Sequence, residues 1–121
     1  QSQRNKEAAA QTQRDRAAIF RLATYECEAN GKALYFFGDG KVYYGINNTG
    51  VYEFPWKDVT IDLLGNYSLK ENVLSWRHTF KLPSLSPEAG ELHLETFKFY
   101  RKILNNGTIY NGKCKLVKSK G

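Results

Sequence analysis

From residue 24 onward, apolar and polar residues alternate in short runs, and turn residues separate these runs. Alternation with a period of two is typical of strands that have one buried face. Turn signals such as Asn30-Gly31, Gly38-Asp39-Gly40 and Asn106-Gly107 recur along this region. Short strands separated by regular turns indicate antiparallel pairing. The pattern therefore predicts an antiparallel β-sheet head.

The alternation also predicts where strands begin and end. Gly65-Asn66 is expected to turn the chain, and near Thr96 the alternation slips by one, which predicts a bulge or bend. The strand after this bulge is expected to continue to residue 104. The expected strands cover 25–28, 33–37, 42–46, 51–54, 59–63, 67–69, 73–80, 91–104, 108–110 and 113–117.

Residues 2–22 have a different pattern. Gln, Arg, Lys, Glu and Ala dominate, and neither Gly nor Pro interrupts them, which favours a helix. Its apolar stripe becomes continuous only near Ile19 and Leu22, so its first half is expected to project from the head. We therefore expect an α+β, mostly β fold, with a helical stem over 1–23 and a head over 24–121. The head is expected to form two sheets or an open barrel.

Composition adds information on the compartment. The chain contains no Met, which predicts a processed or trimmed product whose upstream segment was removed. Cys27 and Cys114 flank the β region. We expect a disulfide between them, which would tie the first strand to the last and would indicate an oxidising compartment; two free buried thiols are the alternative.

The positive charge is concentrated at the C-terminal end. The net charge is +6, yet no acidic residue follows Glu95. This asymmetry predicts a site for a polyanion such as DNA, whereas a solubilising end is the alternative interpretation. The candidate residues are Lys98, Arg101, Lys102, Lys113, Lys115, Lys118 and Lys120. Tyr100 and Tyr110 are possible stacking residues beside them.

The sequence offers little for catalysis. His78 shares an apolar face with Trp76 and is expected to be structural, and His93 is expected to face solvent. A zinc site needs three or four ligands at workable spacing, which two distant Cys and two scattered His do not supply. We therefore expect no enzyme, no cofactor and no metal. Three glycosylation acceptor patterns begin at Asn47, Asn66 and Asn106, and turn-rich β proteins collect Asn in such contexts.

One resemblance concerns the segments 90–94, 97–103 and 106–109, together with 59–61 and 73–80. These strand-turn-strand patterns are similar to the last strands of minor pilins and pseudopilins. The resemblance implies a subunit of a type IV pilus, a DNA-uptake machine or a type II secretion filament. Its N-terminal helix would contact other filament subunits, and a missing upstream segment would anchor it in the membrane.

A second resemblance is carried by Tyr25-Glu26-Cys27, Gly65-Asn66-Tyr67-Ser68 and Cys114. These segments look like the small periplasmic β-barrels that inhibit lysozymes, in which a loop Ser and a loop Lys plug the enzyme cleft. Ser68 would match that Ser. The alternative to the filament subunit is therefore a periplasmic barrel that acts as an inhibitor or as a lipocalin-like binding protein. Both interpretations predict an extracytoplasmic protein, in the periplasm or at the cell surface.

Overall fold

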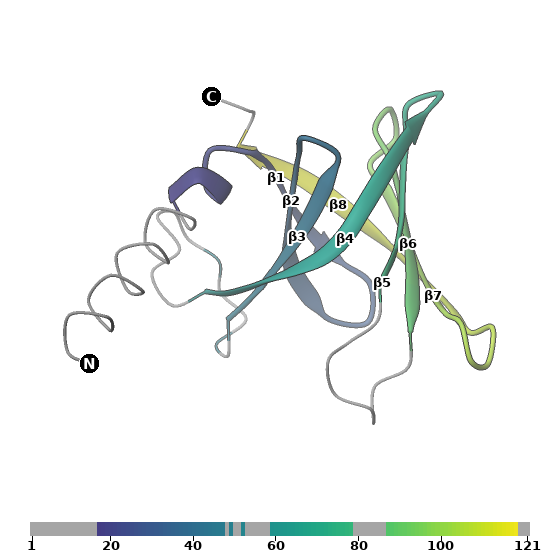
Figure 1. Cartoon of the computed structure of the whole chain (residues 1–121). Helices are drawn as coiled ribbons and strands as arrows, with labels where there is room; N and C mark the ends of the chain where they lie inside the picture. Colours follow the sequence, from purple (N-terminus) through teal and green to yellow (C-terminus); the bar gives the residue numbers. More distant parts are fainter. Residues whose placement is uncertain (1–16, 48, 50–51, 53–58, 79–86, 119–121) are drawn as a thin grey trace, which may run out of the picture.

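The computed structural model describes residues 17–47, 49, 52, 59–78 and 87–118. These residues form a closed barrel in which each strand pairs with the next and β8 returns to β1 (Figure 1). Every pairing is antiparallel. The strands are β1 (Ala23–Glu28), β2 (Lys32–Gly38), β3 (Lys41–Ile46), β4 (Thr60–Lys70), β5 (Val73–His78), β6 (Glu88–His93), β7 (Lys98–Ile103) and β8 (Ile109–Lys118).

Turn chemistry and a disulfide fix this topology. The β2–β3 turn has positive φ at Asp39 (53°) and Gly40 (77°), as a tight hairpin requires. At the seam, Cys27 of β1 lies directly opposite Cys114 of β8, and the two are bonded. The expected disulfide is therefore confirmed. It joins two cysteines that are 87 residues apart in the sequence, and it links the first strand of the barrel covalently to the last.

The expected α+β fold with a helical stem is wrong. The described residues are nearly all β, and their only helical segment is 17–19. The helix ends because Arg21 and Leu22 donate backbone hydrogen bonds to Ala18 and Ile19, three residues back, which tightens the last turn. β1 then begins at Ala23. Most of the expected stem, residues 1–16, lies outside the described residues.

Three expected strand boundaries are also wrong. Gly65 does not turn the chain, because β4 continues through it with Leu64 as an extra residue between two register pairs. The phase slip near Thr96 marks the turn between β6 and β7, where Phe97 has φ 61°. The two expected last strands are one strand, β8. The expected strand over 51–54 lies almost wholly outside the described residues.

The barrel interior is filled mainly by aromatic side chains. Tyr35, Phe37, Trp76 and Phe99 are each at least 95% buried. Their rings contact one another with centroids 5.2–6.5 Å apart. Aromatic pairs at such spacing add stabilisation beyond their buried area. The interior is thus a packed core rather than an open ligand cavity.

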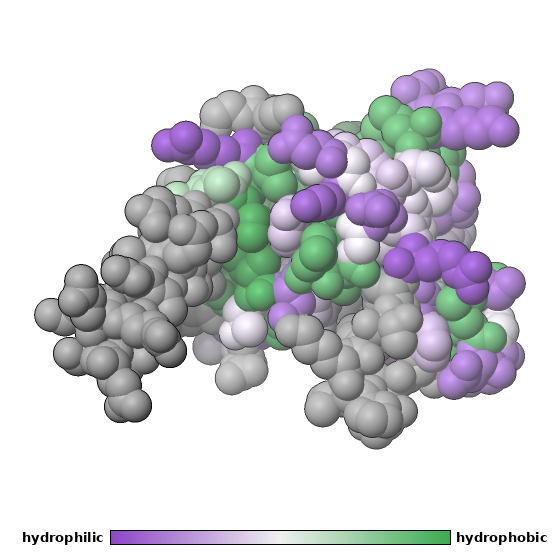
Figure 2. All heavy atoms as spheres, viewed as in Figure 1, coloured by the Kyte–Doolittle hydropathy of each residue, from purple (hydrophilic) through white to green (hydrophobic). Residues whose placement is uncertain are grey.

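A second apolar cluster lies outside the barrel wall. Leu34 and Phe36 of β2 are fully buried there by Val59 and by partly buried side chains that include Ile19, Phe20 and Leu22. Apolar residues are visible on this side of the molecule, over β3 and β4 (Figure 2). The short segment after residue 16 therefore acts as a cover for the outer face of β2 and β3. Across the described residues, no helix is long and apolar enough to cross a membrane.

Candidate functional site

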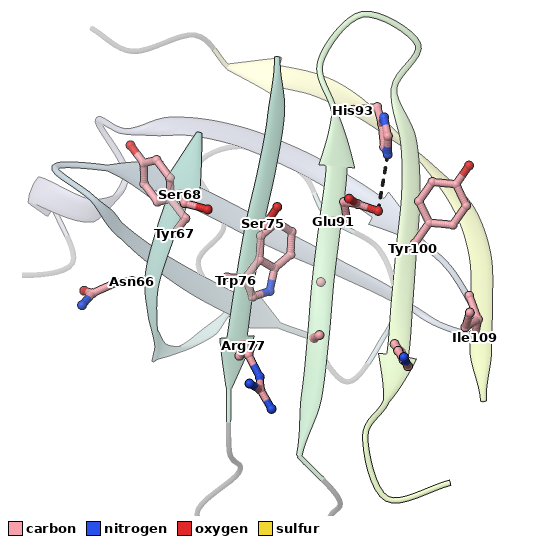
Figure 3. Close-up of a pocket in the computed structure, with 13 residues that line it drawn as sticks. Asn66, Tyr67, Ser68, Ser75, Trp76, Arg77, Glu91, His93, Tyr100 and Ile109 are labelled. Atoms are coloured by element: carbon pink, nitrogen blue, oxygen red, sulfur yellow. Dashed lines mark ion pairs between the residues drawn. The ribbon is translucent and has the colours of Figure 1, made fainter. Parts of the chain in front are cut away.

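A groove of about 950 Å³ lies on the outer face of β4 to β8 (Figure 3). We call it the outer groove. Its size falls in the range typical of ligand pockets. Its polar and charged side chains come from the four neighbouring strands β4 to β7 and converge on one concave surface, and β8 contributes the apolar Ile109. The residues used below are Ser68, Ser75, Arg77, Glu91, His93, Tyr100 and Lys102.

Strand register places these side chains in rows. Ser75 of β5 lies opposite Glu91 of β6, which lies opposite Tyr100 of β7. A second row lies two residues further along β5, where Arg77 of β5 and Lys102 of β7 lie on either side of Ala89 of β6. Because directly opposed residues point to the same side of a sheet, each row forms a continuous strip across the strands.

Gly90 shapes the floor of the outer groove. A Cβ atom at this position would come within 2.3 Å of the Trp76 indole. Only glycine therefore lets the indole lie directly beneath β6. The buried Nε1 of Trp76 has no hydrogen-bond partner among the described residues. Since Gly90 lacks a side chain, the ring and the strand approach closely at the groove floor.

The outer groove contains charged side chains of both signs. Its acidic residue Glu91 lies 3.5 Å from His93 (Oε2 to Nε2), and this contact is drawn in Figure 3. Arg77 and Lys102 are exposed. Within the described part of the chain, neither of these two cations has an ion pair. The groove thus presents two cations with no carboxylate bound to them.

The structure separates the seven basic residues that the sequence grouped together. Lys98 and Lys113 lie directly opposite each other on β7 and β8, and both are exposed. Lys102 lines the outer groove. Lys115 is on the outer face of β8 and pairs with Glu26 at 2.9 Å (Nζ to Oε2). Lys118 ends β8, its side chain lies outside the described residues, and so does Lys120.

Arg101 was predicted to belong to a surface site for a polyanion, and of the seven basic residues its contacts differ most from that prediction. Its Nη2 lies 2.6 Å from Oε1 of Glu88, and the Glu88 side chain is only 5% exposed. Its Nη1 donates to the carbonyl of Ala29 at 2.8 Å and lies over the β1–β2 turn. The guanidinium also lies 5.7 Å from the ring centroid of Tyr110. Arg101 therefore points into the barrel end and stabilises it, instead of joining a surface site.

Two phenols share this barrel end with Arg101. Burial raises the pKa of Tyr35 and of Tyr44, and the nearby Arg101 charge opposes that rise. Both phenols line a cavity of about 220 Å³ beside Glu88 and Arg101. The cavity is too small to hold more than a few water molecules or a small ligand. It lies under the β1–β2 turn.

Sequence reasoning missed Arg77. Its signal was the alternation of β5, which places it on the face opposite buried Trp76. The expectation for His93 was correct in that it lies on the outer face. The side chain of His78 lies outside what the structure describes. In the described residues, no group of three or more His, Cys, Asp or Glu side chains is placed to hold a metal ion.

Comparison with known proteins gives no relative from which to transfer a function: no family model, curated protein or solved structure matches this chain. The function must therefore be inferred from the groove itself.

Proposed function

We propose that this chain is a non-enzymatic, extracytoplasmic binding protein built on a small β-barrel, and that it recognises an anionic partner on its outer surface. The observation that carries this proposal is the placement of Arg77, Lys102, Lys98 and Lys113 on the outer face of β5 to β8. Unpaired cations gathered on one face raise the local concentration of anions and their association rate.

The Cys27–Cys114 disulfide supports the extracytoplasmic part of the proposal, since such bonds persist mainly in oxidising compartments. The closed barrel, in turn, supports the small-barrel interpretation over the filament subunit. The filament interpretation depends on a long stem, and the stem residues 1–16 lie outside the described part of the chain. The filament subunit therefore stays an untested prediction.

Within the small-barrel interpretation, the outer groove is the better candidate for binding than the interior. Aromatic rings occupy the interior, so a lipocalin-like ligand would have to displace core packing. Ser68 lies in β4 and lines the outer groove. It is not in a loop, so the loop-plug mode of the lysozyme inhibitors does not enter the proposal.

Binding of inorganic polyphosphate tests the proposal, because this probe offers charge alone. We expect calorimetry at low salt to detect binding that weakens steeply as salt rises, since bound cations release counterions from the polymer. The variant Arg77→Gln/Lys102→Gln should lose most of this affinity.

The matched control is Arg21→Gln/Lys32→Gln, which removes the same charge from exposed positions away from the outer groove. It should bind as the wild type does. If both double variants weaken binding equally, net charge and not the outer face governs binding. If the wild type shows no binding at low salt, the proposal is wrong.

A further inference from the structure

The outward side of β7 carries three residues of complementary chemistry at alternate positions: Lys98, Tyr100 and Lys102. Lys98 and Lys102 are exposed and Tyr100 is half-buried, whereas Phe99 between them is buried in the core. At about 3.3 Å per residue, the Cα atoms of the two lysines are roughly 13 Å apart. An aromatic ring thus lies midway between two cations on one strand.

A second cation stands beside each of these lysines. Lys113 of β8 is directly opposite Lys98, and like charges in this position destabilise a strand pair. On the other side of Tyr100, Lys102 of β7 and Arg77 of β5 both lie opposite Ala89 of β6. Only the small side chain of Ala89 therefore lies between these two cations. The ring of Tyr100 therefore lies between two pairs of cations, Lys98 with Lys113 and Arg77 with Lys102.

Tyr100 also belongs to the lining of the outer groove. Among the described residues, the ring that contacts it is His93, at 5.4 Å between centroids and an interplanar angle of 75°. His93 holds the Tyr100 side chain from the β6 side, and Figure 3 shows the phenol standing up from β7 beside it. The ring is thus positioned at the surface of the groove instead of being inserted into the core.

Cations along a groove with an aromatic ring between them are the combination that binds single-stranded nucleic acid: phosphates pair with the cations and a base stacks on the ring. In a duplex the bases already stack on one another and are not available to a side chain.

We propose that the anionic partner is single-stranded nucleic acid, with a base stacked on Tyr100 and phosphates at the two cation pairs. This inference rests on the proposed function, because it names the ligand of the same face. Glu91 lies in the row of Tyr100 and opposes phosphate binding. Glu91→Gln should therefore tighten binding, and the tightening should fade at high salt.

The experiment compares three labelled probes by fluorescence anisotropy: a twelve-nucleotide oligothymidine, a duplex of the same length, and a heparin oligosaccharide of similar charge. We expect the single strand to bind more tightly than the other two. Four cation contacts predict a slope of log K against log salt of about −2.8 for a single strand.

The deciding variants are Tyr100→Leu and Tyr100→Phe. Leucine removes the stacking surface and should weaken binding of the single strand by at least about fivefold, with little effect on heparin. Phenylalanine keeps the ring and should retain the affinity. Both variants must show the intact disulfide and a circular dichroism spectrum like that of the wild type.

The outcomes separate this inference from the proposed function. If Tyr100→Leu binds oligothymidine as the wild type does, or if duplex or heparin binds as tightly as the single strand, the single-strand inference is overturned while polyanion binding stands. If none of these probes and no polyphosphate binds at low salt, both proposals fail together.

Discussion

The variant Arg101→Met tests whether Arg101 stabilises the barrel instead of contributing to a surface site. It is a sharper test of this distinction than any substitution of a surface residue. In the wild type, the Arg101 guanidinium pairs with the buried Glu88 carboxylate at 2.6 Å and holds the carbonyl of Ala29 at 2.8 Å. Methionine keeps an unbranched apolar side chain and removes every donor. The variant leaves a carboxylate inside the barrel end without its cation.

The expected cost follows from that burial. Removing one partner of a buried pair destabilises by about 3–5 kcal/mol, because the remaining buried charge loses the opposite charge that offset its desolvation. The matched control is Lys102→Met, one residue along β7 on the opposite face. Lys102 is exposed, so its replacement should change the free energy of unfolding by no more than about 0.5 kcal/mol.

Urea unfolding at neutral pH, followed by fluorescence, measures both variants against the wild type. The double variant Arg101→Met/Glu88→Gln should be more stable than Arg101→Met alone, because the Glu88→Gln change removes the buried negative charge that Arg101 offsets. Oligothymidine binding supplies the second measurement, in which Arg101→Met should bind as the wild type does and Lys102→Met should bind more weakly. An Arg101→Met variant of unchanged stability but weakened binding would refute this placement of the side chain.

Three further predictions concern the barrel itself. Cys27→Ser/Cys114→Ser should lower the free energy of unfolding by about 4–5 kcal/mol on the chain-entropy model for a loop of this length, and a reductant should reproduce the loss in wild-type protein but not in the variant. Tyr35 has a pKa raised by burial, so the folded state resists its ionisation. Stability should therefore fall as the pH rises above about 10, and urea titrations at pH 8 and 11 should show a smaller fall for Tyr35→Phe. Gly90→Ala drives a methyl group into the Trp76 indole and should cost about 1–3 kcal/mol, measured as a lower urea midpoint; an unchanged midpoint would mean that the indole moves freely.

Local signals predicted the parts of this fold that depend on neighbours in the sequence. The Asp39-Gly40 hairpin follows from two residues that tolerate positive φ. Other features depend on contacts between distant segments, which a single sequence does not display. Closure of β8 onto β1 is such a contact. Another is the bulge at Leu64, where β3 holds β4 in line through a Gly-Asn pair that would otherwise favour a turn.

The end of the expected helical stem shows how propensity and tertiary structure compete. The composition of 2–22 favours a helix, and within the described part of this range the helix ends after Ile19. Phe20 and Leu22, which follow, pack against the outer wall of the barrel beside Leu34 and Phe36. Burial of these two apolar side chains outweighs the few tenths of a kcal/mol per residue by which propensity would favour a further helical turn.

The inward orientation of Arg101 could have been predicted from the sequence. It was missed because the basic residues were grouped by charge alone. Arg101 is two residues from Phe99, so strand alternation puts both on the buried face. Lys98, Tyr100 and Lys102 fall on the other face by the same rule. The charge at the C-terminal end is therefore divided by strand parity into a structural part and a part available to a ligand.

This division makes β7 the element where stability and the proposed binding meet. Its odd-numbered residues Phe99 and Arg101 fill the barrel. Its even-numbered residues lie on the outer face, where Tyr100 and Lys102 line the outer groove. A strand fixed on one side by a packed ring and a buried ion pair has little freedom to twist, so the residues on its other side keep their spacing. A ligand that needs an aromatic ring between two cations then finds them already in position, and binding incurs less of the entropy cost of ordering them. Rigidity supplied by the inner face should thus contribute to affinity at the outer face, although no inner residue touches the ligand.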